Sequence, residues 1–92
     1  KWLTAIIATE FLVFFRENSD GIKDKKASPE LLEFIKTPKY KEFKEEKFKL
    51  IKKLLDHGQD PYYYGYLRVI LKIVGDEKDL DRLLEQYKKD NK

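Results

Sequence analysis

Apolar residues recur along the chain at helical spacing, in blocks separated by proline, glycine and clusters of polar residues. The first block, residues 2–15 (WLTAIIATEFLVFF), is apolar around nearly the whole circumference of a helix, which is typical of a helix covered on most sides. We therefore predict a first helix over residues 2–16 that forms the hydrophobic centre. Its apolar side chains cannot all point inward, so some of Ile7, Val13 and Phe15 are candidates for contact with a partner.

Three further helices begin with the same local signal, a side-chain oxygen at the N-cap followed by a proline at the first helical position. The three starts are Ser28-Pro29, Thr37-Pro38 and Asp60-Pro61. They predict helices over residues 30–36, 38–56 and 61–74. The polar segment 17–28 is predicted to be a loop, with Gly21 in the left-handed conformation that ends many helices.

The spacing of apolar residues also predicts which side chains point inward. In the helices over 30–36 and 38–56, the predicted inward residues are Leu31, Leu32, Phe34, Ile35, Tyr40, Phe43, Phe48, Leu50, Ile51, Leu54 and Leu55. A fifth helix over 77–89 carries one apolar stripe, formed by Leu80, Leu83, Leu84 and Tyr87. At its start, Asp76 and Asp79 have the spacing of a capping box.

The helix predicted over 61–74 opens with a cluster of tyrosines that cannot all be buried: Tyr62, Tyr63, Tyr64 and Tyr66. We expect one face to carry Tyr66, Ile70 and Ile73, with Val69 beside it. The edge or the outside is expected to carry Tyr62, Tyr63 and Arg68. Gly65 costs about 1 kcal/mol against Ala inside a helix, so it either allows close approach of a neighbour or is simply tolerated.

These elements predict one all-α domain over residues 1–92, a small bundle of about five helices with antiparallel helix-turn-helix pairs. A chain of 92 residues is long enough for a single small domain. The fourth and fifth helices are expected to form a helical hairpin across the break at Gly75-Asp76.

Charged residues make up 40% of the chain, with lysines and acids interleaved and a net charge of +3, which is typical of helices with paired surface charges. This balance permits a nucleic-acid or acidic partner without requiring one. The absence of cysteine excludes disulfides and thiolate metal sites and favours an intracellular reducing compartment. The block 2–15 is shorter than the roughly 20 residues of a spanning helix, and Glu10 interrupts it, so we expect no membrane span.

The sequence offers no pair of groups suited to acid–base or nucleophilic catalysis. His57, the single histidine, falls in the last turn of a predicted helix, where a positive imidazole suits the helix dipole. Asp56 and Asp60 are near it, but no serine or cysteine is close enough in the sequence to act as a nucleophile. We therefore expect no enzymatic activity, no catalytic residue, no cofactor and no metal.

Residues 58–89 resemble a pentatricopeptide repeat, a relative of the tetratricopeptide fold. The matching features are Gly58-x-x-Pro61, Tyr66, Ile70, the break at Gly75-Asp76 and Leu80-x-x-Leu83-Leu84-x-x-Tyr87. The resemblance implies a helical hairpin and binding of single-stranded RNA, usually in mitochondria or plastids. The positions that read bases in that family hold Leu67 and Tyr62 here, which departs from the family's code.

We predict a non-enzymatic interaction module that binds a protein partner. The candidate partner-binding residues are Tyr62, Tyr63, Arg68 and Lys72, and self-association through the first helix is a further prospect. One alternative is single-stranded RNA binding, with the tyrosines as stacking platforms. Another is a computationally designed or stabilised helical domain without natural activity, because Lys/Glu-rich helices that lack Cys and Met are typical of design.

Overall fold

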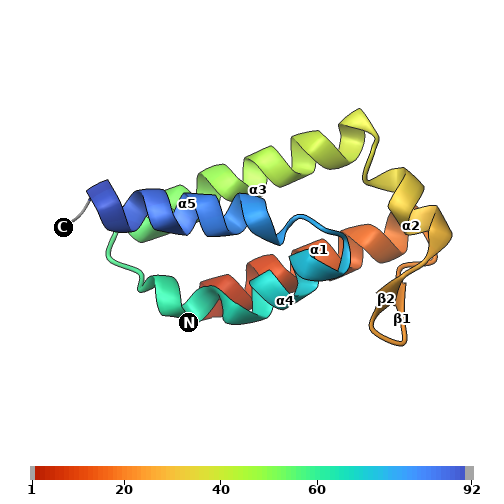
Figure 1. Cartoon of the computed structure of the whole chain (residues 1–92), viewed down its shortest axis with the longest axis horizontal. Coiled ribbons are helices and arrows are strands. Elements are labelled where there is room, and N and C mark those ends of the chain that lie inside the picture. Colours follow the sequence, from red (N-terminus) through yellow and green to blue (C-terminus); the bar gives the residue numbers. More distant parts are fainter. Residues whose placement is uncertain (1, 91–92) are drawn as a thin grey trace.

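The computed structural model describes residues 2–90 and is predominantly α-helical, which confirms the predicted fold class. Figure 1 shows the elements in chain order. They are α1 (Trp2–Asn18), β1 (Ile22–Lys23), β2 (Lys26–Ala27), α2 (Pro29–Phe34), α3 (Pro38–Asp56), the 3₁₀ helix η1 (Pro61–Tyr64), α4 (Gly65–Ile73) and α5 (Glu77–Asp90).

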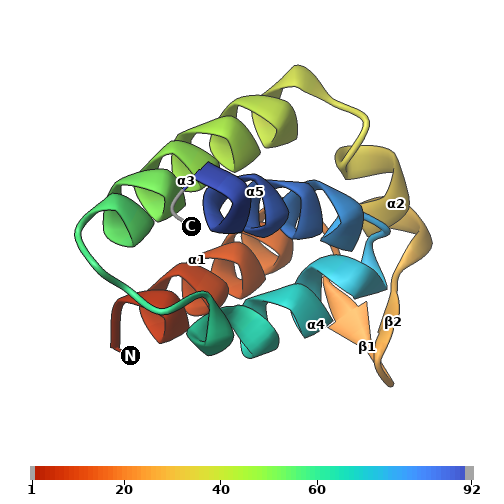
Figure 2. The same ribbon diagram turned by 60° about the vertical axis from the view of Figure 1, so that its left-hand side comes forward.

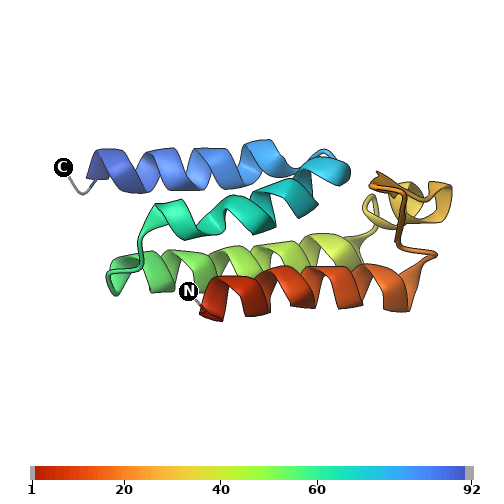
Figure 3. The same cartoon turned by 90° about the horizontal axis from the view of Figure 1, so that it is seen from below.

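The four long helices form a bundle, and α2 and the small sheet occupy one end of it (Figures 1 and 2). α1 and α3 run antiparallel, α4 packs on α1, and α5 packs on α4 and returns beside α3 (Figure 3). The expected hairpin of the fourth and fifth helices is therefore present as α4 and α5.

The core lies between these helices and includes four residues of α1, as expected for a central helix. Its buried apolar residues are Ile7, Ala8, Phe11, Phe15, Leu31, Tyr40, Ile51, Leu55, Tyr64, Leu67, Ile70, Leu71, Val74 and Leu80. Aromatic rings join α1 to α3, since Phe43 meets Phe11 edge-on, with 5.0 Å between the ring centroids. Such ring pairs contribute about 0.5–1.5 kcal/mol beyond their buried area.

All three predicted helix starts form with the expected caps. The Ser28 hydroxyl accepts from the Leu31 amide at 3.1 Å, and the Thr37 hydroxyl accepts from the Tyr40 amide at 3.4 Å. The Asp60 carboxylate accepts from the Tyr62 amide at 2.9 Å. Each cap satisfies an amide that would otherwise lack a partner in the first helical turn, so these boundaries follow from local sequence alone.

The segment 17–28 is more ordered than the predicted loop. It holds a two-stranded antiparallel hairpin in which Ile22 pairs with Ala27 and Lys23 with Lys26. Asp24 and Lys25, with φ of 52° and 62°, form the left-handed two-residue turn whose twist suits a hairpin. Strands of two residues are too short to show an alternating pattern, which is why the sequence did not reveal them.

Several predicted orientations are wrong. Ile7 and Phe15 are fully buried and so are not available to a partner, whereas Val13 is only partly buried. Leu32 and Leu50, predicted to point inward, are 45% and 39% exposed. Both lie at the margin of an apolar stripe, where a shift of a fraction of a turn decides whether a side chain is covered.

The tyrosine face also differs from the prediction, because residues 61–74 are not one α-helix. The first four residues form η1, which has about three residues per turn, and α4 begins only at Gly65. The change of pitch buries Tyr64 and leaves Tyr66 56% exposed. A Cβ at Gly65 would meet nothing within 4 Å, so no neighbour approaches closely there and the glycine is simply tolerated.

Candidate functional site

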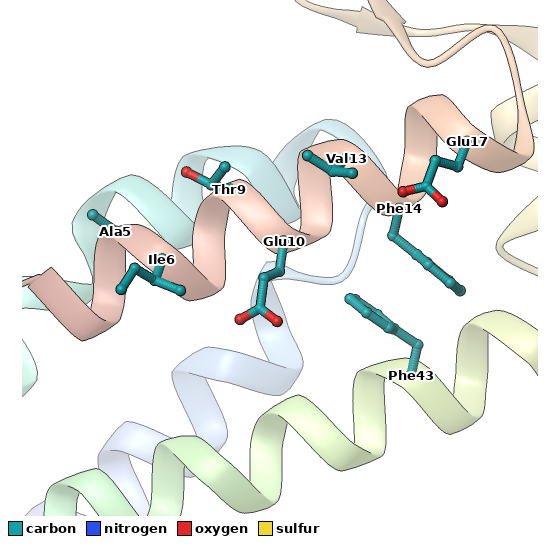
Figure 4. Close-up of a pocket in the computed structure, with 8 residues that line it drawn as sticks. All are labelled: Ala5, Ile6, Thr9, Glu10, Val13, Phe14, Glu17 and Phe43. Carbon is teal, nitrogen blue, oxygen red and sulfur yellow. The ribbon is translucent and has the colours of Figure 1, made fainter.

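An open groove of about 530 Å³ lies along the outer side of α1 (Figure 4). We call it the α1 groove and define it by its lining residues, Ala5, Ile6, Thr9, Glu10, Val13, Phe14, Glu17 and Phe43. All but Phe43 belong to α1, and most of the exposed surface is apolar. Ile6 is 50% exposed there, and Leu3, one turn earlier on α1, is 51% exposed.

The contact between α1 and α3 sets the shape of the groove. Phe14 and Phe43 stack with 3.9 Å between their ring centroids and an interplanar angle of 5°. One turn after Phe43 on α3, Lys47 donates to Glu10, which lies one turn before Phe14 on α1, at 2.7 Å. Figure 4 shows Ile6, Glu10 and Phe14 directed toward α3, with Ala5, Thr9 and Val13 directed away from it. The antiparallel pair thus holds one side of the groove in a fixed geometry.

The groove exists because α1 is more apolar than its neighbours can cover. α4 packs on one face of α1, and α3 contacts one edge through Phe43 and Lys47. On the face that carries Ala5, Thr9 and Val13, the first two residues are exposed and Val13 is partly buried, and all three line the groove. An apolar helix face that is left uncovered is a common mark of an interaction site.

The charges at the groove come from both helices. Lys39 and Lys47 of α3 lie over the Phe14 and Phe43 rings, at 5.9 and 5.3 Å from the centroids. The Lys39 ammonium also donates to the Asn18 side chain at 2.7 Å. Lys47 neutralises Glu10, whereas the part of the chain that is described contains no ion pair of Glu17. Glu17 therefore lines the groove without an ion-pair partner among the described residues.

The four residues predicted from the sequence lie on η1 and α4 rather than at the groove. Tyr62 is 84% exposed, and its ring meets that of Tyr63 edge-on at 5.9 Å. Arg68 donates to both carboxylate oxygens of Asp81 on α5, at 2.8 and 3.0 Å. Lys72 is exposed on α4. The structure therefore pairs the two tyrosines with each other and ties Arg68 to α5.

The ion pair between Arg68 and Asp81 favours the charged form of both side chains. The hydrogen bond from Arg68 lowers the pKa of the Asp81 carboxyl, and the same bond raises the pKa of Arg68. Both side chains are well exposed, so solvent screens the pair and it adds little to stability. Its main effect is to hold the guanidinium over α5.

A polar network that sequence reasoning missed joins α3 to the start of α5. The Tyr40 hydroxyl donates to Asp76 at 2.7 Å, and Lys44 donates to Asp79 at 2.9 Å. Burial, followed by the hydrogen bond to Asp76, raises the pKa of Tyr40, and the bond from Lys44 lowers the pKa of Asp79. The Asp76 side chain therefore ties α3 to the start of α5, a role that depends on residues more than 30 positions apart.

His57 has the structural role that its position indicated. It caps α3, and its Nδ1 lies 2.7 Å from the Lys53 carbonyl oxygen. Within residues 2–90, no cluster of three His, Cys, Asp or Glu side chains is placed to hold a metal ion. Over the same residues, no helix has the length and apolar character needed to cross a membrane.

Comparison of the chain with protein-family models, with curated proteins and with solved structures returned no match.

Proposed function

We propose that this protein is a non-enzymatic interaction module whose α1 groove binds an amphipathic helix of a protein partner. The observation that carries the proposal is the uncovered apolar face of α1, bordered by the Phe14–Phe43 stack. A helix with residues at i, i+3, i+4 and i+7 on one face is the usual occupant of such a groove. A designed monomer would be expected to cover this face, so the groove favours a binding role over a domain without activity.

The dimensions of the groove suit a short helix. Its lining extends from Ala5 to Glu17 along α1, which at 1.5 Å per residue is about 18 Å. A partner helix of three to four turns has this length. Its apolar stripe would contact Ile6, Val13 and the exposed edge of Phe43, while its polar face would remain in water.

The test uses a synthetic helical peptide of about four turns, with leucines on one face and glutamines elsewhere. Ile6→Asp places an unpaired charge on the apolar face, so we expect at least a tenfold loss of peptide affinity, about 1.4 kcal/mol, by fluorescence anisotropy. Val69→Asp is the matched control, because Val69 is 57% exposed on α4, away from the groove. Equal losses in the two variants, or no binding to the unaltered chain, would contradict the proposal.

Single-stranded RNA is the second candidate, supported by the exposed ring of Tyr62 and by Lys72 on the neighbouring helix. Bases stack on exposed aromatic rings, with about 1–3 kcal/mol per base. The pairing of Arg68 with Asp81 weakens this candidate, because that cation is already engaged. A labelled oligonucleotide pool that shows no binding at low salt would exclude it. Binding that falls in Tyr62→Ala and with added salt would favour it.

A further inference from the structure

The charged residues along the α1 groove are sorted by helix. Its lining holds two acids, Glu10 and Glu17, and both belong to α1. Two lysines of α3 stand opposite them. Lys47 donates to Glu10 at 2.7 Å, and Lys39 donates at 2.7 Å to Asn18, the residue that follows Glu17. Together these four charges cancel, but they form an acidic side on α1 and a basic side on α3.

An acidic side and a basic side at matching levels make this face complementary to itself. α1 and α3 are antiparallel neighbours, so Glu10 lies level with Lys47, and Glu17 lies level with Lys39 (Figure 3). Rotation of a second copy by half a turn, about an axis that runs along the groove, places its α3 over the α1 of the first copy at the same level. Each acidic side then meets a basic side, and the contact occurs twice by symmetry.

The exposed apolar side chains of the two helices match in the same way. Ile6, one turn before Glu10 on α1, is 50% exposed, and Leu50, about one turn after Lys47 on α3, is 39% exposed. The rotation brings Ile6 of each copy onto Leu50 of the other. Removal of these side chains from water supplies the main driving force for association.

Arg16 lies beside this face, and the same rotation gives it an acidic neighbour. It follows Val13 by one turn, on the side of α1 that is directed away from α3 (Figure 4). On α3, Lys44 contacts α5, so Glu42, two residues earlier, lies on roughly the opposite side of that helix. Arg16 and Glu42 are within two residues of the stacked rings that join the helices, so they are level with each other. The rotation therefore places Arg16 of each copy beside Glu42 of the other.

On the basis of the proposed function, we infer that the helix that occupies the α1 groove is α3 of a second copy of this chain. The two copies form a symmetric dimer in which the α1–α3 face of each covers that of the other. This face is about 25 Å long, from the 17 residues of α1, and about 20 Å wide, from two helix diameters, so roughly 500 Å² is covered on each copy. That area is at the lower limit for a specific interface, so the dimer dissociates on dilution.

Two other occupants of the groove are outcomes of the same experiments. A helix of a different protein would leave this chain monomeric. A second copy with its α1 against α1 would bring acidic side onto acidic side, which costs energy.

The first experiment measures self-association by sedimentation equilibrium over a range of chain concentrations. We expect a monomer–dimer equilibrium whose Kd rises with added salt. Ile6→Asp should raise the Kd about tenfold or more, because it places a charge against Leu50 of the other copy. Val69→Asp, exposed on α4, is the matched control and should leave the Kd unchanged. The leucine-faced helical peptide should dissociate the dimer, since both occupy the α1 groove.

The second experiment reverses charges to test which helices pair. Glu17→Lys and Lys39→Glu, both at exposed positions, should each weaken the homodimer about tenfold, since each places like charges together at two symmetric contacts. An equimolar mixture of the two variants should dimerise again, because both contacts of the mixed pair join opposite charges. Melting temperatures close to that of the unaltered chain show that the variants are folded.

Three results would overturn the inference. A chain that stays monomeric at about 1 mM while the peptide still binds would refute the dimer and leave the proposed function intact. A monomeric chain that also fails to bind the peptide would refute both. Dimerisation that the mixture of charge variants fails to restore would refute the pairing of α1 with α3.

Discussion

Tyr40 and Tyr64 are the two tyrosines with fully buried rings, and burial changes how they respond to high pH. Burial raises the pKa of Tyr64 from 10.0 to about 12. The pKa of Tyr40 is raised further in the same direction, first by burial and then by its hydrogen bond to Asp76. Because the folded pKa values exceed the unfolded value, both groups contribute stability that is complete below about pH 10 and is lost above it.

We therefore expect the free energy of unfolding to fall between about pH 10 and pH 12, by up to about 1.4 kcal/mol per pH unit for each buried tyrosine. Denaturant unfolding at a series of pH values measures this slope. Tyr64→Phe should make the decline shallower, because one titrating group is removed. Tyr62→Phe, at an exposed ring, is the control and should leave the slope unchanged. An unchanged slope in Tyr64→Phe would contradict the assignment.

Among the elements, those specified by neighbouring residues were predictable and those specified by distant residues were not. The caps at Ser28, Thr37 and Asp60 act within three positions of their partners, so the starts of α2, α3 and η1 could be read from the sequence. The change of pitch at Gly65 could not, because nothing local distinguishes a 3₁₀ turn from an α-helical one. Residues 24 and 25 adopt a hairpin turn without the usual glycine, so that signal was missing too.

The candidate site was also only partly predictable, because part of it depends on residues distant in the sequence. Of the candidates for partner contact on the first helix, Val13 is partly buried and lines the α1 groove, and whether it contacts a partner stays a prediction. The lining residues between α1 and α3, above all Ile6 and Phe43, were not assigned to a site, because their exposure depends on the angle between these two helices. Tyr62 and Arg68 were expected to be outside and are exposed, but whether they contact a partner stays a prediction.

Lys44 joins α3 to two carboxylates at the start of α5, beside the Tyr40–Asp76 hydrogen bond. Lys44 is mostly buried and lies 2.9 Å from Asp79 and 3.6 Å from Asp76. Lys44→Met should remove the cation that joins these two carboxylates and leave Asp79 with Arg82 alone, 2.6 Å away. We expect a cost of about 1 kcal/mol, a value reduced by solvent screening at the partly exposed acids. Chemical denaturation measures the loss, and Lys41→Met, exposed on the same helix, should change stability by less than about 0.5 kcal/mol.

The dependence of stability on pH at low pH provides a check on the contact between Lys44 and Asp79. The lowered pKa of Asp79 contributes stability that is present above its ordinary value of 3.8 and is lost as the pH falls below that value. Without Lys44 only Arg82 still stabilises the Asp79 carboxylate, so this contribution should shrink and the decline below about pH 3.8 should be shallower in Lys44→Met. An unchanged decline of stability at low pH in Lys44→Met would show that Lys44 does not lower the pKa of Asp79.

In the molecule as a whole, α3, α4 and α5 pack together with α1 but leave one side of α1 uncovered. α4 and α5 pack tightly, and the Tyr40–Asp76 bond holds α3 at one end. The face of α1 that these helices leave free is apolar, fixed by the Phe14–Phe43 stack, and bordered by Glu17. A small domain of this kind has a stability of roughly 5–14 kcal/mol, so it can leave one such face uncovered and still fold.

The most direct test of this account is to map where a helical peptide binds. Backbone amide signals of the isotope-labelled chain are followed by NMR while the leucine-faced helical peptide is added. We predict that the shifted signals belong to α1 between Ala5 and Glu17 and to α3 around Phe43, with little change at Tyr62 and Tyr63. Shifts confined to η1 and α4, or no shifts at saturating peptide, would contradict the claim that the α1 groove is the binding site.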